Sequence, residues 1–187
     1  MSRLEYTAIT SLDGYTTDQT GDFLWATPDA EVMAFINDLE GDVGTQLLGR
    51  RMYETMVYWE TFDTTDVEAT SLERDFTEIW KKAEKVVYST TLEKASSERT
   101  RIERAFDADT VRQLKEAAQH NISIAGPNLA SQAFAAGLID DVHLFLTPVV
   151  IGGGTSALPR ERLSRFELRA VDRFVSGVVH LHYDSSD

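Results

Sequence analysis

The chain has 187 residues, of which 42% are apolar and 26% are charged, a composition ordinary for one soluble globular domain spanning 1–187. It contains no cysteine, which excludes disulfides, thiolate nucleophiles and cysteine-held metal sites. The formal net charge is −13, so we expect no binding to nucleic acid. Because there is no signal-peptide pattern and no membrane-length apolar run, we expect a cytoplasmic protein that binds no membrane.

The negative charge is unevenly distributed along the chain. Residues 1–80 contain 17 acidic and 4 basic residues, whereas the remainder contains 14 of each. Between Arg3 and Arg74 the only cations are the adjacent pair Arg50 and Arg51. Acidity of this kind is typical of a soluble surface, and a lone cationic pair within it is a candidate anion site.

Hydrophobic periodicity predicts strands and helices that alternate as far as residue 150, followed by strands alone. Strands are expected at 4–11, 45–48, 85–89, 100–103 (an edge strand), 121–125 and 142–151, the last broken or bulged at Pro148. An antiparallel hairpin is expected from 166–174 and 177–183. This order predicts an α/β fold with a mixed, mainly parallel sheet and an antiparallel edge.

Helices and loops fill the intervals between these strands. Helices are expected over 28–39 with proline in the first turn, over 51–58 directly after Gly49, over 72–80, after a cap at Asp109, and over 126–136. Loops are expected at 12–21 and at the acidic segment 61–70, which we expect to be the most mobile.

Three strand-to-helix junctions suit phosphate binding, because a helix start offers free N–H groups and a positive dipole end. At the first, Gly49 permits close backbone approach, and the two following arginines can bind phosphate oxygens bidentately. Cations at a helix start oppose the dipole, which leaves little structural reason for them. The alternative is an exposed pair that balances nearby acids.

The other two junctions carry weaker signals. Ser89, Thr90 and Thr91 offer three consecutive hydroxyls after a strand, although such residues are also common in turns. Gly126 and Pro127 form a tight helix start that suits a pyrophosphate, or is simply a short turn. Trp25 and Tyr53 are aromatic candidates for a heterocycle pocket, with core packing as the alternative for each.

Two further patterns do not indicate a site. Gly152, Gly154 and Ala157 match the spacing of a dinucleotide fingerprint, but Pro159 interrupts the helix that this fingerprint requires. His180 and His182 share a strand face, yet two imidazoles without a third ligand make a poor metal site. We therefore expect no metal.

Taken together, the order of motifs resembles the dihydrofolate-reductase-like superfamily, and most closely the branch containing the C-terminal reductase domain of the bifunctional riboflavin-biosynthesis deaminase/reductase. The resemblance covers residues 4–183 and rests on five runs, at 10–15 (TSLDGY), 48–54 (LGRRMYE), 88–92 (YSTTL), 125–127 (AGP) and 146–154 (LTPVVIGGG). It implies a three-layer α/β/α fold with a mixed eight-stranded sheet that binds NADPH.

The resemblance also implies roles for individual residues. Cofactor contacts fall on Ile9, Gly49, Arg50, Arg51, Met52, Ser89, Thr90, Ala125, Gly126, Pro127, Asn128 and Leu129, with Ala125 in place of a usual glycine. Substrate contacts fall on Trp25, Tyr53 and Thr147. Asp13 is the first candidate for the catalytic proton donor, with Asp29, Glu31 or a water as alternatives.

These implications predict an NADPH-dependent reductase that transfers a hydride to a C=N or C=O of a small, pterin- or pyrimidine-like substrate. It would resemble 5-amino-6-(5-phosphoribosylamino)uracil reductase, although the acidic first part favours a neutral or cationic substrate over a sugar phosphate. Dihydrofolate reductase activity and non-catalytic NADPH binding are the alternatives. The strand 142–151 and the C-terminal hairpin are expected to offer exposed edges, so we expect a homodimer.

Overall fold

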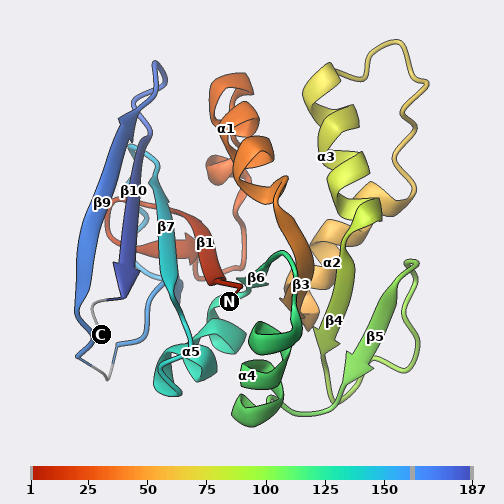
Figure 1. The fold of residues 1–187 in the computed structure, drawn as a ribbon. Coiled ribbons are helices and arrows are strands. Elements are labelled where there is room, and N and C mark those ends of the chain that lie inside the picture. The colour runs from red at the N-terminus through yellow and green to blue at the C-terminus, as the bar shows by residue number, and fades with distance from the viewer. Residues whose placement is uncertain (1, 161–162, 186–187) are drawn as a thin grey trace.

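The computed structural model describes residues 2–160 and 163–185 and is built on one eight-stranded sheet with the order β5-β4-β3-β6-β1-β7-β10-β9 (Figure 1). Its strands are β1 (Leu4–Thr10), β3 (Val43–Gly49), β4 (Glu84–Tyr88), β5 (Thr100–Glu103), β6 (Asn121–Ala125), β7 (Asp141–Leu146), β9 (Phe166–Arg173) and β10 (Val179–Ser185). A separate two-stranded sheet pairs β2 (Tyr15–Thr17) with β8 (Thr155–Ser156).

The first six strands of the large sheet run parallel, and among the eight strands only β10 runs in the opposite direction. Neighbouring strands from β5 to β7 are parallel, whereas β10 is antiparallel to both β7 and β9. The α/β fold with a mixed eight-stranded sheet and an antiparallel C-terminal hairpin is therefore confirmed. The insertion of β6 between β1 and β3 brings segments that are far apart in the sequence into direct contact.

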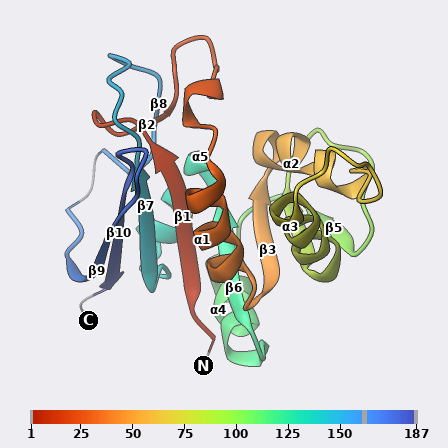
Figure 2. The same ribbon diagram turned by 90° about the horizontal axis from the view of Figure 1, so that it is seen from above.

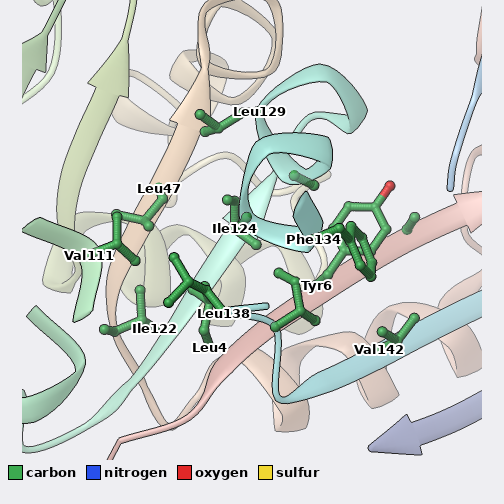
Figure 3. Packing of buried hydrophobic residues seen from close by; sticks show 14 of the residues in the cluster. Leu4, Tyr6, Leu47, Val111, Ile122, Ile124, Leu129, Phe134, Leu138 and Val142 are labelled. Carbon is green, nitrogen blue, oxygen red and sulfur yellow. The ribbon is translucent and has the colours of Figure 1, made fainter. Parts of the chain in front are cut away.

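Helices cover both faces of the sheet (Figures 1 and 2). They are α1 (Ala30–Glu40), α2 (Arg50–Met56), α3 (Ser71–Lys82), α4 (Ala108–Ala117) and α5 (Pro127–Ala135), with short 3-10 helices η1 (Leu24–Ala26) and η2 (Val57–Glu60). On the face covered by α4 and α5, alternate residues of the central strands form the main apolar core (Figure 3). Within the described residues no helix has the length and apolarity that crossing a membrane requires.

The structure corrects the expected strand 142–151, which is shorter than predicted. β7 ends at Leu146, and Thr147 N makes the last contact with β1 by donating to Thr10 O at 2.7 Å. The backbone then turns out of the sheet, because Val149 N donates back to Thr147 O at 2.7 Å. Pro148 has no N–H with which to continue a ladder. β7 also lies between β1 and β10, so it offers no exposed edge, and the two edge strands of the sheet are β5 and β9.

Three local expectations also change. Asp107, not Asp109, caps α4, because its side chain accepts from Thr110 N. Pro28 precedes the cap of α1 and lies outside its first turn, since Asp29 is the cap. The predicted loop 12–21 contains β2, whose partner β8 comes from the opposite end of the chain. A strand of three residues leaves too little periodicity to be read from sequence.

Candidate functional site

The three predicted junctions lie side by side along one edge of the sheet. β4, β3 and β6 are parallel neighbours, so their carboxyl ends meet at the same edge, where β1 and β7 also end (Figure 2). The register pairs Gly49 with Tyr88 and Leu48 with Ala125. In open α/β sheets, ligands bind outside the carboxyl ends of the strands. The fold therefore brings the candidate residues of all three junctions together.

Gly49 and Gly126 are in close backbone contact. Gly126 has a φ of +100°, a conformation that side-chain-bearing residues rarely adopt. A Cβ atom added to Gly126 would lie 3.6 Å from Gly49 N and 3.7 Å from the Cβ of Met52. The start of α5 thus lies against the start of α2, with no side chain between the two backbones. Such a surface lets a ligand approach peptide N–H groups directly.

Arg50 joins the first two junctions. Its Nη1 donates to Thr91 Oγ1, and its Nε donates to Glu54 Oε1 at 2.8 Å. Arg51, the next residue, is exposed, and its guanidinium has no hydrogen-bond or ion-pair partner in the described part of the chain. Arg50 therefore connects α2 to the turn after β4, while Arg51 presents an uncompensated charge at the same place.

The turn after β4 is shaped by Ser89. The buried Ser89 Oγ accepts from Leu92 N at 2.9 Å and from Thr91 N at 3.3 Å. Arg104 lies outside this turn and donates to Ser89 O at 3.0 Å and to Leu92 O at 2.7 Å. The sequence offers no signal for this role of Arg104. Ser89 accordingly orders the turn, and the next residue, Thr90, is exposed.

At the third junction the predicted contacts divide between surface and core. Leu129 is buried in the main core, and the partly buried Ala125 packs against the cluster around Leu48. Pro127 and Asn128 line a hollow of about 360 Å³ beside the start of α5. This junction can therefore contact a ligand through its backbone groups and through Pro127 and Asn128.

Ile9, predicted to contact the cofactor, lies close to Thr147, predicted to contact the substrate, whereas Tyr53, also predicted to contact the substrate, lies elsewhere. Ile9 is the penultimate residue of β1, and Thr147 directly follows β7, which pairs with β1. Tyr53 is only 1% exposed, and its hydroxyl lies 2.9 Å from Ser97 Oγ and accepts from Ser96 N. Tyr53 therefore packs in a core and does not line a pocket, which corrects that prediction.

Trp25 is the third residue predicted to contact the substrate. It lies in η1 within the segment that follows β2, and it is half-buried. Its Nε1 donates to Asp22 O at 3.3 Å. The indole is thus held by its own loop.

The three candidate acids all accept backbone hydrogen bonds. Asp13 accepts from Gly152 N at 2.8 Å and from Ile151 N at 3.2 Å, and hydrogen bonds, first from Ser11 and then from these amides, lower its pKa. Asp29 caps α1, and bonds from Ser176 and Val32 lower its pKa. Glu31 accepts from Val175 N at 2.9 Å. These contacts give each carboxylate a structural role.

Comparisons with known proteins agree with this fold. The sequence profile of the family described as RibD C-terminal domain matches residues 3–180. A comparison with curated proteins gave no match.

Several solved structures share the fold at low sequence identity. A candidate riboflavin biosynthesis protein from Shewanella sp. PV-4 has a TM-score of 0.76 at 17% identity, covering 99% of both chains. The deaminase/5-amino-6-(5-phosphoribosylamino)uracil reductase of Thermotoga maritima has a TM-score of 0.69 at 15% identity, covering 99% of this chain and 57% of that one. Dihydrofolate reductase from Enterococcus faecalis, solved with NADP(H), has a TM-score of 0.67 at 14% identity, covering 99% of this chain and 97% of that one.

Proposed function

The chain belongs to the RibD C-terminal domain family, and we propose that it is an NADPH-dependent reductase of a small heterocyclic substrate. The observation that carries the proposal is the contact between Gly49 and Gly126, flanked by Arg50 and Arg51 at the carboxyl edge of the sheet. The Thermotoga maritima relative is a pyrimidine-derivative reductase, and the Enterococcus faecalis neighbour was solved with NADP(H). Both support a reductase that uses this cofactor.

The residues at this edge fit a phosphorylated dinucleotide. The close approach of Gly49 and Gly126 leaves backbone accessible where a Cβ atom would otherwise stand, which suits a pyrophosphate. Arg51 has a free guanidinium and Arg50 shares its own with Glu54 and Thr91, a donor set that suits a 2′-phosphate. The cation pair would select NADPH over NADH, since only NADPH carries that phosphate.

In the proposed reaction NADPH supplies a hydride to a C=N or C=O carbon. The protein orients the two rings and keeps water away from them. Ile9 and Thr147, at the ends of neighbouring strands, would border the reacting rings, and Trp25 would cover them from its loop. Asp13 is ionised at neutral pH, because its pKa lies below the usual range, so a bound water is the better proton donor.

The substrate is proposed to be a neutral or cationic pterin-like or pyrimidine-like molecule. Residues 1–80, which carry the whole excess of acid, contribute β1, α1 and the segment that holds Trp25. Dihydrofolate reduction receives no separate support, because Asp29 and Glu31 at the start of α1 are both engaged by backbone amides.

The decisive experiment compares binding of NADPH and NADH by wild type and the double variant Arg50→Ala/Arg51→Ala. We expect the variant to lose about 2–5 kcal/mol of NADPH binding free energy and to bind NADH almost unchanged. The matched control is Lys81→Ala/Lys82→Ala, an adjacent exposed cationic pair on α3 that makes the same change in net charge. Equal binding of both nucleotides by wild type and variant would exclude the proposed role of the arginines.

Turnover separates the reductase from a protein that only binds the cofactor. Wild type with NADPH is assayed against a panel of pterins, pyrimidines and small carbonyl compounds, following absorbance of the reduced nicotinamide. Oxidation with any member supports the reductase. Tight binding without oxidation of any of them would favour the non-catalytic alternative.

A further inference from the structure

The turn that follows β4 is held from two sides by arginine side chains. On one side, Arg50 of α2 donates to Thr91 Oγ1. On the other, Arg104 donates through its Nη1 atom to two carbonyl oxygens, Ser89 O at 3.0 Å and Leu92 O at 2.7 Å. These carbonyls belong to the first and last residues of the turn 89–92. A single guanidinium therefore joins the two ends of the turn and fixes their separation.

Arg104 reaches the turn from the end of an edge strand. It directly follows β5, which lies beside β4 (Figure 1), and the last residue of β5, Glu103, accepts from Ser89 N at 2.9 Å. Arg104 is exposed and has no carboxylate partner in the described parts of the chain. Arg101, on β5 itself, instead pairs with Glu103. The charge of Arg104 is thus oriented by neutral carbonyl groups alone.

The turn connects Arg104 to the proposed 2′-phosphate site. Arg50 donates through Nε to Glu54 at 2.8 Å and through Nη1 to Thr91 Oγ1, so Thr91 is one of two groups that orient this guanidinium. Thr91 keeps this position only while the turn keeps its shape. A turn released from its outer clamp gains conformational freedom, and a ligand that needs the ordered turn must then remove that freedom on binding.

We propose that Arg104 is a positioning residue that sets the preference for NADPH over NADH without touching the nucleotide. It clamps the turn 89–92, which holds Thr91 and, through Thr91, the guanidinium of Arg50. The inference rests on the proposed function, because that function assigns Arg50 to the 2′-phosphate. Only the phosphorylated cofactor depends on this guanidinium, so loss of the clamp weakens NADPH and spares NADH.

The test compares wild type, Arg104→Gln and Arg104→Lys in two measurements. Calorimetry gives the affinity for NADPH, for NADH and for adenosine 2′,5′-bisphosphate, which carries the 2′-phosphate without the nicotinamide. Hydrogen exchange with residue resolution follows Thr91 N and Leu92 N in the free protein, because both amides donate to Ser89 Oγ inside the turn. The second measurement reports on the turn whether or not a nucleotide binds.

The matched control is Arg101→Gln. It makes the same change in net charge from the same edge strand, and its side chain pairs with Glu103 and not with the carbonyls of the turn. Thermal unfolding checks that every variant remains folded.

We expect both amides of Arg104→Gln to exchange about ten-fold faster, and NADPH and adenosine 2′,5′-bisphosphate to bind about ten-fold more weakly. NADH binds as it does to wild type. Arg104→Lys recovers most of both losses, because an ammonium group has three N–H donors for the two carbonyls. Arg101→Gln behaves as wild type in both measurements.

A double-mutant cycle tests the route through Thr91. Thr91→Val removes the hydroxyl that accepts from Arg50 and keeps the branched shape of the side chain. If Arg104 acts through Thr91, the two substitutions together weaken NADPH by less than the product of their separate factors. Fully multiplicative factors would overturn the inference.

The remaining outcomes separate this inference from the proposed function. Unchanged NADPH affinity in Arg104→Gln overturns the inference and leaves the proposed function standing. Weaker NADPH binding with unchanged amide exchange does the same, because Arg104 would then contact the phosphate itself. An equal loss of NADPH and NADH shows a purely structural role and also overturns the inference. A wild type that binds neither nucleotide contradicts the proposed function, and the inference with it.

Discussion

Glu5 and Asp141 lie opposite each other on the paired strands β1 and β7, and both side chains are buried on the same face of the sheet. They are the centre of a continuous cross-strand row of polar residues that spans all eight strands: Thr100, Lys85, Gln46, Ser123, Glu5, Asp141, Asp184 and Glu167. This row crosses the sheet near the amino end of β1, away from the proposed cofactor edge.

The two carboxyls of this pair have opposite pKa shifts. Burial, with the charges of Asp141 and Glu40, raises the pKa of Glu5 to about 7. Burial acts in the same direction on Asp141, but hydrogen bonds from Arg3 and His182 outweigh it and hold the pKa of Asp141 below its usual value. The chain therefore contains one carboxyl that titrates near neutral pH inside the fold.

We predict that Glu5→Gln flattens the decline of stability between about pH 4.5 and 7. The folded pKa of Glu5 lies above its ordinary value of 4.5, so its contribution is complete below pH 4.5 and is lost as pH rises through about 7. The loss in wild type is about 3 kcal/mol by pH 8. Glutamine keeps an acceptor for Asn121 Nδ2.

Urea unfolding from pH 4.5 to 8.5 measures this effect. The control is Glu116→Gln, which removes an exposed carboxylate from α4 and should leave the pH profile of wild type unchanged. A Glu5→Gln profile that remains parallel to wild type across this range would contradict the prediction.

A second pH effect, of opposite sign, is expected from His143. Its Nδ1 lies 3.0 Å from His180 Nε2, and its ring stacks on His182 with centroids 4.2 Å apart. Burial, followed by the neighbouring imidazoles, lowers the pKa of His143 to about 3. Its contribution is therefore complete above pH 6.5 and is lost as pH falls toward 3, by about 1–2 kcal/mol between pH 7 and 5.

His143→Gln should remove this fall in stability between pH 7 and 5, whatever effect the substitution has on stability at pH 7. The same unfolding series, read as the change in free energy of unfolding with pH, gives the result. His120→Gln, at an exposed histidine, is the control and should keep the slope. An unchanged slope in His143→Gln would show that His143 titrates normally.

Asp13 is predicted to anchor the glycine-rich segment that follows β7. Because its two carboxylate oxygens accept from Ile151 N and Gly152 N, Asp13→Ala should make both amides exchange about ten-fold faster, while Asp13→Asn, with one acceptor oxygen, keeps the protection of one of them. Hydrogen exchange with residue resolution measures this. If Asp13 instead donates the catalytic proton, Asp13→Asn abolishes turnover although one amide stays protected.

We propose that the protein is a homodimer through β9, one of the two edge strands of the sheet. A bulge opposite Tyr183 places Leu168 and Val171 on one face, where they are 53% and 50% exposed. Exposed apolar residues on an unpaired edge strand favour association with a second copy. Leu168→Lys/Val171→Lys should convert the dimer to a monomer in light scattering at micromolar concentration.

Val175→Lys provides the control, because Val175 is 96% exposed between the two strands of the hairpin and lies outside this patch. It should remain dimeric. A monomeric wild type, or a double variant that stays dimeric, would contradict the proposal.

The sequence predicted most elements because their signals are local. The Gly126-Pro127 helix start and the alternation of the central strands depend on neighbouring residues only. Tyr53 was misassigned because burial depends on what surrounds a residue, and Ser96 and Ser97 approach its hydroxyl from a distant segment. Asp107 and Asp109 are equally good caps in sequence, and only the path of the chain selects one.

By itself the sequence determined the fold class, the family resemblance and the three glycine- or hydroxyl-bearing junctions, since each follows from a short motif. Tertiary structure alone decided that these junctions meet, because β6 inserts between β1 and β3. The tertiary structure also decided where the cationic pair of the acidic first part lies. The one cationic pair of the acidic first part lies at the proposed cofactor edge, where the starts of α2 and α5 are in contact.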